Sequence, residues 1–150
     1  MITIEPIKSA DLLAKAHHIR KIVFVIEQQC PEDIEWEFED ESHHYLALWN
    51  NETAGTARWR TTENGIKLER FAVLKEFRNK EVGKALLLRL VADTNMFNQK
   101  RYLHAQLPAK NFYLRHGFKA VGEHFWEADI EHVKMEYKIP EVLQPQVLSR

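Results

Sequence analysis

Cysteine is almost absent from this sequence, and so is any long apolar run. Cys30 is the only cysteine among 150 residues, so no disulfide can form within the chain. The apolar stretches fall short of the roughly 20 residues that a transmembrane helix needs, and the N-terminus lacks the basic and apolar pattern of a signal peptide. These absences predict a cytoplasmic protein that does not engage a membrane.

An excess of charge of one sign is also missing. The 21 Lys and Arg residues nearly balance the 22 Asp and Glu residues, so the net charge does not favour nucleic acid as a partner. Histidine occurs as adjacent pairs at 17–18 and 43–44, and adjacent side chains diverge on a helix or a strand. Without zinc-ligand spacing elsewhere, the sequence predicts no metal site.

What the sequence does contain is material for one folded domain. Hydrophobic residues make up 45% of the chain, and the length suits a single core. We therefore expect one domain at residues 1–140 and a C-terminal tail at 141–150, where no regular hydrophobic period is found.

Hydrophobic periodicity predicts elements in the order β-α-β-β-β-α-β-α-β-β, which is an α/β (α+β) pattern. Strands are expected at residues 2–8, 45–49, 53–60, 66–73, 102–106, 118–123 and 133–139. Helices are expected from a cap at Ser9 to about residue 28, from 82 to about 97, and at 109–116.

The most informative stretch is a basic turn between the strand at 66–73 and the helix that follows it. A turn leading into a helix N-terminus aims unpaired N–H groups and the positive end of the helix dipole at one point, which suits a pyrophosphate. The predicted contacts are Arg78, Asn79, Lys80, Glu81, Val82, Gly83 and Lys84. The alternative is a basic surface turn before an ordinary core helix.

Residues 78–83, Arg-Asn-Lys-Glu-Val-Gly, resemble the acetyl-CoA loop of the GCN5-related N-acetyltransferase (GNAT) family, Arg/Gln-x-x-Gly-x-Gly/Ala. Glu81 stands where the family usually has its first glycine, and we expect its carboxylate to point outward. The resemblance covers nearly the whole chain and fits the small bacterial branch called ElaA-like or YjcF-like. It implies the GNAT fold: a central mixed, mostly antiparallel sheet flanked by helices on both faces, with splayed fourth and fifth strands.

The same resemblance implies further cofactor contacts on the fourth strand. The pantetheine arm of acetyl-CoA would bond to the main chain there like an added strand, at Phe71, Ala72 and Val73. The N–H of Val73 would hold the developing oxyanion. A plain core strand is compatible with the same residues.

A second block of resemblance lies at residues 103–118. It implies contacts with the cofactor arm from Gln106, which replaces a family Asn, and from Ala109 and Phe112. Tyr113 would protonate the thiolate that leaves as the tetrahedral intermediate collapses. The alternative is a core tyrosine packed on Phe112.

The acceptor side is less clearly marked. An amine must lose a proton before it attacks, and we consider Glu69 and Glu27 as the base, with His104 and His132 behind them. The segment 32–41 holds seven acidic residues and could guide a cationic acceptor or be a solvated loop. Arg58 and Arg60 share one face of their strand and could answer this acidity.

The sequence thus predicts an N-acetyltransferase that moves an acetyl group from acetyl-CoA to a small-molecule or peptide amine in a ternary complex. The competing hypothesis is a non-catalytic acyl-CoA sensor or protein-interaction module on the same fold. A homodimer is left open.

Overall fold

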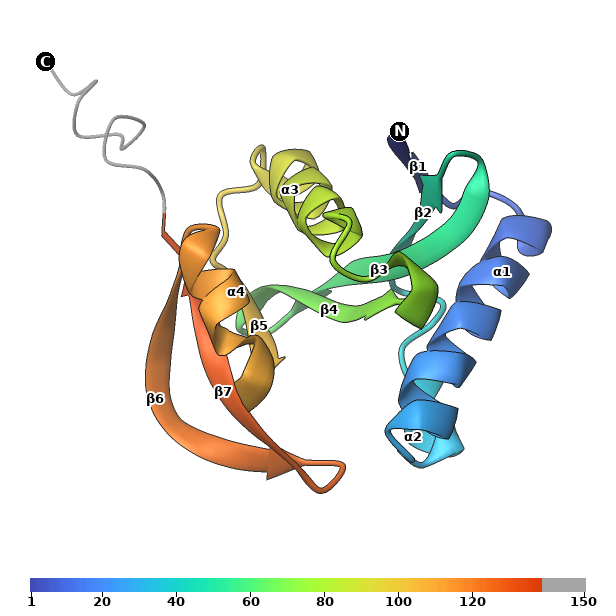
Figure 1. The fold of residues 1–150 in the computed structure, drawn as a ribbon. Helices are drawn as coiled ribbons and strands as arrows, with labels where there is room; N and C mark the ends of the chain where they lie inside the picture. Colours follow the sequence, from blue (N-terminus) through green and yellow to red (C-terminus); the bar gives the residue numbers. More distant parts are fainter. Residues whose placement is uncertain (139–150) are drawn as a thin grey trace, which may run out of the picture. The chain divides into compact units, whose positions relative to one another are not determined.

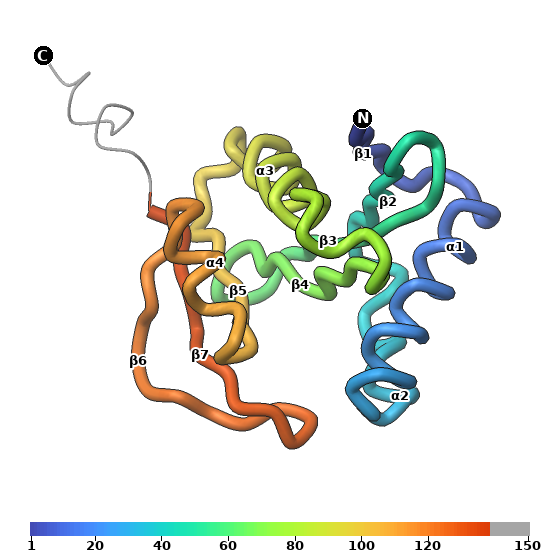
Figure 2. Tube along the Cα trace, viewed as in Figure 1, coloured from blue at the N-terminus to red at the C-terminus, as the bar shows by residue number. Residues whose placement is uncertain are grey.

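The computed structural model describes residues 1–138, which fall into two compact units (Figures 1 and 2). The first unit spans Met1–Gln99, and the second begins at Lys100. The predicted domain boundary at residue 140, the tail at 141–150 and the last residue of the predicted final strand lie outside the described residues. The single-domain organisation therefore stays a prediction.

The first unit is a four-stranded antiparallel sheet with its helices. Its strands are β1 (Ile2–Pro6), β2 (His43–Trp49), β3 (Glu52–Thr62) and β4 (Gly65–Val73), and they pair in sequence order. Its helices are α1 (Ala10–Arg20), the π-helix η1 (Lys21–Glu27), α2 (Glu32–Glu35), the 3₁₀-helix η2 (Lys75–Phe77) and α3 (Val82–Thr94). Within this unit β4 is an outer strand.

Helices α1 and α3 cover opposite faces of this sheet (Figure 1). Leu46 on β2 packs against Ala16 and Ile19 of α1. The next residue back along β2, Tyr45, points to the other face and donates its hydroxyl to Asp93 of α3 at 2.8 Å. Alternation along a strand produces this division, because successive side chains point to opposite sides of the sheet.

The first predicted helix is present, but it is not α-helical throughout. The Ser9 side chain accepts the Leu12 N–H at 3.2 Å and caps α1 as expected. After Arg20 the chain widens into η1, where the Gln28 N–H bonds to the Val23 carbonyl five residues back at 3.2 Å. This segment is rich in β-branched residues, which lose side-chain freedom in a regular α-helix.

Gly55 on β3 lets α3 pack closely against the sheet. A Cβ atom built at this position would lie 2.9 Å from the Ala72 carbonyl oxygen and 3.1 Å from Val82. This oxygen belongs to the main chain of β4, so it cannot move aside as the end of a flexible side chain would. The start of α3 is thereby held directly over the end of β4, which is where the predicted phosphate-binding turn lies.

The second unit contains three antiparallel strands in the order β5-β7-β6. The elements are β5 (Arg101–Gln106), the 3₁₀-helix η3 (Leu107–Ala109), α4 (Lys110–Arg115), β6 (Phe118–Glu127) and β7 (Ile130–Tyr137). Strand β6 extends four residues beyond the prediction. Its side chains are mostly exposed on both faces, so hydrophobic alternation did not mark its second half.

Among the helices that the structure describes, none has the length and apolar character needed to cross a membrane. The described residues likewise contain no group of three or more His, Cys, Asp or Glu side chains arranged to hold a metal ion.

Candidate functional site

The predicted phosphate-binding turn joins the end of β4 to the start of α3 (Figure 1). The first hydrogen bond inside α3 runs from the Ala85 N–H to the Glu81 carbonyl at 3.0 Å. The N–H groups of residues 82–84 therefore have no acceptor within the helix. Such a helix terminus combines free donors with the positive end of the helix dipole, which is the geometry that binds phosphate groups.

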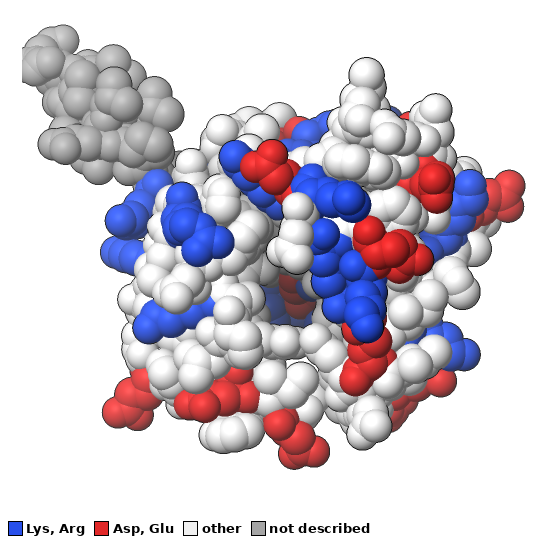
Figure 3. Space-filling model, viewed as in Figure 1, with Lys and Arg blue, Asp and Glu red and all other residues white. Residues whose placement is uncertain are grey.

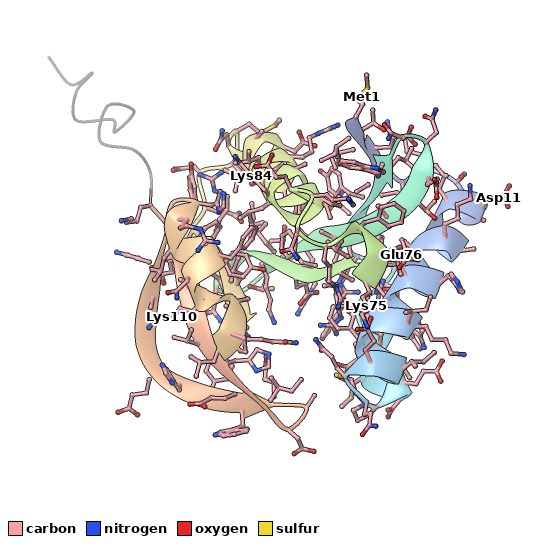
Figure 4. All side chains as sticks on the ribbon, in the orientation of Figure 1. Met1, Asp11, Lys75, Glu76, Lys84 and Lys110 are labelled. Atoms are coloured by element: carbon pink, nitrogen blue, oxygen red, sulfur yellow. The ribbon has the colours of Figure 1, made fainter. Side chains whose placement is uncertain are left out.

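Basic side chains surround this turn. Figure 4 labels Lys75 and Glu76 beyond the end of β4 and Lys84 on α3. Arg78 and Lys80 are exposed on the turn itself, and Figure 3 shows Lys and Arg side chains gathered on this face with acidic groups among them. The local charge is thus more positive than the near-neutral chain as a whole, as phosphate binding requires.

Two residues of the turn adopt the left-handed backbone conformation. Asn79 has φ of 64° and Glu81 has φ of 66°, a region in which a Cβ atom clashes with the following carbonyl oxygen and glycine does not. Glu81 is the position where the GNAT loop usually has its first glycine, so the backbone geometry explains that preference. The Glu81 side chain is 74% exposed and lies 3.6 Å from Lys84, so the expectation that it points outward is confirmed.

Glu81→Gly should therefore raise the free energy of unfolding by about 0.5–1 kcal/mol, because glycine adopts a positive φ without strain. It should also tighten CoA binding, because it removes a carboxylate from the turn. Urea denaturation and calorimetry measure the two effects. Glu81→Gln is the matched control: it should improve CoA affinity without the gain in stability. A destabilised Glu81→Gly protein would contradict this reading of the turn.

Arg78, predicted as a phosphate contact, also ties the turn to β4 and to η1. Its Nε donates to the Val73 carbonyl at 2.9 Å. Its two terminal nitrogens donate to the two carboxylate oxygens of Glu27 at 3.0 and 3.2 Å. The structure therefore brings three predicted site residues together, and Glu27 is a partner of the turn as well as a candidate base.

Strand β4 carries a bulge directly before the predicted cofactor segment 71–73. Glu69 pairs with Arg58 and Ala72 pairs with Thr56, so one residue of β3 faces two residues of β4 between them. Arg70 lies in this bulge with a left-handed φ of 59°. The bulge re-aims the strand just where the cofactor arm is expected. Sequence reasoning missed it because a lone arginine gives no bulge signal.

Glu69, the other candidate base, lies in a buried group of cations. Arg58 Nε and Arg60 Nε donate to it at 2.7 and 2.8 Å, and Lys67 lies 3.4 Å away. Burial raises the pKa of this carboxyl, but Arg58, Arg70 and Lys67 outweigh burial and lower it to about 2. Glu69 is therefore ionised and holds protons weakly at neutral pH.

The acidic segment 32–41 contributes to the same group. Glu35 accepts from Arg20 Nε at 2.7 Å, and Glu39 pairs with both Arg20 and Arg58. Both arginine side chains are only 1% exposed. Part of the segment is thus a short helix, α2, and Glu35 and Glu39 turn their carboxylates inward. The other five acidic residues of the segment are exposed, so the picture of a solvated loop holds for them and not for these two. The expectation that Arg58 answers this acidity is confirmed.

In the second unit the predicted acid, Tyr113, is buried on α4. Its ring lies edge-on to Phe112 at 5.1 Å and to Phe118 at 5.9 Å between centroids. Burial raises the pKa of the Tyr113 phenol, so the hydroxyl stays protonated at neutral pH. Protonation is the state that a proton donor needs, and the aromatic contacts fix the ring.

The remaining predicted residues of this unit follow β5. Gln106 is the last residue of β5 and the register partner of His132 on β7, and Ala109 precedes α4. His104 Nδ1 lies 3.4 Å from a Glu127 carboxylate oxygen, and His132 Nε2 lies 3.9 Å from the other. The two histidines considered as bases therefore share one carboxylate, a grouping that sequence spacing did not indicate.

Residues 14–139 match the acetyltransferase (GNAT) domain model, and the chain belongs to this family. The predicted membership is therefore confirmed, and so is its consequence that the protein is an acyltransferase. The chain is 35% identical over 132 residues to the uncharacterized N-acetyltransferase YjcF of Bacillus subtilis (strain 168), covering 85% of this chain and 94% of YjcF.

Solved structures confirm the GNAT fold. The crystal structure of Escherichia coli ElaA superposes with a TM-score of 0.80 at 26% identity, over 92% of this chain and 100% of ElaA. A GNAT family acetyltransferase from Elizabethkingia anophelis, solved with acetyl-CoA bound, has a TM-score of 0.66 at 20% identity, over 90% of this chain and 94% of that chain. These likenesses establish the fold.

Proposed function

We propose that the protein transfers the acetyl group of acetyl-CoA to a primary amine by direct attack in a ternary complex. The observation that carries this proposal is the turn before α3, where the first N–H donors of the helix lack intrahelical partners and basic residues lie beside them. These donors would hold the diphosphate of CoA. Residues 78–84 supply this contact.

The pantetheine arm would continue along β4, bonded to the main chain of residues 71–73. The small side chain of Ala72 would let the arm approach the main chain, and the N–H of Val73 would stabilise the oxyanion. In the second unit, Gln106, Ala109 and Phe112 would contact the arm. Arg78 supports this segment, because its bond to the Val73 carbonyl fixes the end of the strand.

In the reaction, the lone pair of the amine forms a bond to the thioester carbon, and the carbonyl oxygen becomes an oxyanion. As this intermediate collapses the carbon–sulfur bond breaks, and Tyr113 gives its proton to the departing sulfur. The proton of the attacking amine passes to a base. Tyr113 is then reprotonated from solvent before the next turnover.

For that base we place Glu27 ahead of Glu69. A carboxylate with a pKa of about 2 accepts a proton from an amine poorly. Glu69 would instead hold Arg58 and Arg60 in position. His104 and His132 follow as candidates, since each has Glu127 beside it.

An acceptor screen tests the proposal. Purified protein is given acetyl-CoA with a panel of polyamines, amino sugars, amino acids and peptide amines, and CoA release is followed with a thiol reagent. We expect release well above the no-acceptor rate with at least one class. If CoA binds but no amine accelerates release, the protein is the non-catalytic sensor instead.

A further inference from the structure

The buried ion group between the sheet and α1–α2 contains more positive than negative charge. Five permanent cations share three carboxylates, and each cation lies within ion-pair distance of at least one of these carboxylates. The cations are Arg20, Arg58, Arg60, Lys67 and Arg70, and the carboxylates are Glu35, Glu39 and Glu69. An uncompensated charge in such a place is costly unless a further anion joins it.

The excess positive charge lies at the solvent-accessible edge of the ion group. Arg20 and Arg58 are 1% exposed, whereas the Arg70 side chain is 23% exposed. Arg20 and Arg58 each have bonds of 2.7 Å to a carboxylate oxygen. A ligand from solvent can therefore reach Arg70 without disturbing the buried pairs.

Arg70 is also the least satisfied arginine of the group. Its Nε is buried without a hydrogen-bond partner, and the nearest carboxylate oxygen, on Glu35, lies 3.5 Å away. One terminal nitrogen reaches the Ile34 carbonyl at a long 3.3 Å. Glu35 is already bound by Arg20. A guanidinium has five N–H donors in a fork that matches an oxyanion, and these two long contacts leave most of them available.

The backbone places this guanidinium where the reaction is expected. Arg70 has the left-handed φ of the β4 bulge, which is strained for a residue with a Cβ atom, and strain of this kind clusters at functional sites. It directly precedes residues 71–73, the segment proposed for the acetyl-pantetheine arm. An anion held by Arg70 would thus lie close to the acetyl group.

From these observations we infer that Arg70 binds an anionic group, a carboxylate or a phosphate, carried by the amine acceptor. This inference rests on the proposed acetyl transfer, and it defines the acceptor class as amino acids or amino sugar phosphates rather than polyamines. Within the acidic segment 32–41, Glu35 and Glu39 are already neutralised inside the protein, so these two carboxylates do not attract a cationic acceptor.

Binding tests the inference without turnover. The protein is saturated with CoA, so that the phosphate-binding turn is filled, and is then titrated by calorimetry with malonate and with inorganic phosphate. We expect saturable binding of one of the two, weakened at least about tenfold by Arg70→Gln, since a bond to a charged group contributes about 1.5–3 kcal/mol. Lys67→Gln, the same charge change on the same strand, is the control and should bind within about twofold of the wild type.

Turnover then identifies the source of the anion. An α-amino acid is compared with its carboxamide, and glucosamine 6-phosphate with glucosamine. The charged member of one pair should have the higher kcat/KM, and Arg70→Gln should abolish that preference through KM for the acceptor, leaving KM for acetyl-CoA unchanged. Arg70→Lys keeps the charge without the fork and should retain part of the preference.

The outcomes separate the two proposals. If CoA binds and the anions do not, or if Arg70→Gln binds them as the wild type does, the inference is wrong while acetyl transfer can stand. If CoA itself does not bind, the proposed function fails. The anion titration is then repeated without CoA on the wild type and on Arg70→Gln, and the difference between the two proteins decides whether Arg70 is an anion site.

Discussion

Tyr113→Phe should lower kcat for acetyl transfer by about 10²- to 10⁴-fold, the contribution that a positioned general acid makes. The phenol is buried and stays protonated at neutral pH, because burial raises its pKa. Phenylalanine keeps the edge-on contacts with Phe112 and Phe118 and removes the hydroxyl that would donate the proton. Stopped assays of CoA release, together with calorimetric titration of CoA, separate the chemical step from binding.

Tyr137→Phe provides the matched control. Its ring also packs against Phe118, at 5.3 Å between centroids, so the substitution removes a hydroxyl from the same aromatic cluster. It should leave kcat within about threefold of the wild type. Equal losses in kcat and in CoA affinity for Tyr113→Phe would assign Tyr113 to packing or binding rather than to proton transfer.

The second large effect concerns stability. Arg58→Met should lower the free energy of unfolding by about 3–5 kcal/mol, the loss measured when one partner of a buried ion pair is removed. Arg58 is fully buried and pairs with both Glu39 and Glu69, so its loss removes the cation that links these two carboxylates inside the protein. Urea denaturation followed by circular dichroism measures the change.

A surface pair gives the comparison. Lys21 and Glu32 lie 3.8 Å apart with about half of each side chain exposed, so Lys21→Met should cost no more than about 1 kcal/mol. If the two substitutions lowered the free energy of unfolding by similar amounts, the buried ion group would not contribute more to the stability of the first unit than a surface pair does.

Acid should reduce the difference between wild type and Arg58→Met. The pKa of Glu69 is lowered from 4.5 to about 2 in the folded wild type, so its pairing stabilises the fold above pH 4.5 and is lost as pH falls through 2. Without Arg58 that pKa should lie higher, and the dependence on pH should weaken. The two unfolding free energies, measured between pH 7 and pH 3, should therefore converge.

The sequence predicted the framework because apolar periodicity records which faces are buried. Val82, Leu86 and Leu90 mark one face of α3, and all three are buried as expected. Every predicted strand and helix has a counterpart among the described residues. The turn before α3 was also recognisable from the sequence, because basic residues precede the start of the helix and Gly83 lets a ligand approach the backbone closely.

The ion group could not be predicted in the same way. A buried arginine such as Arg20 has the same sequence signature as an exposed one, and only its carboxylate partners, Glu35 and Glu39, make its burial tolerable. The left-handed φ of Arg70 and Glu81 was hidden for a related reason, because neither residue type is typical of that conformation. The buried ion group and these two backbone conformations are therefore known from the structure and not from the sequence.

The central claim is that the N-terminus of α3 holds the diphosphate of CoA. Its most direct test is calorimetric titration of the wild type and of Gly83→Asp with CoA. An Asp in the first turn of a helix favours the helix dipole, so the variant should fold as stably as the wild type, while its charge should repel the phosphates. We predict one CoA per chain for the wild type and at least about tenfold weaker binding for Gly83→Asp, equivalent to about 1.4 kcal/mol. No heat with the wild type, or equal affinities for the two proteins, would contradict the account.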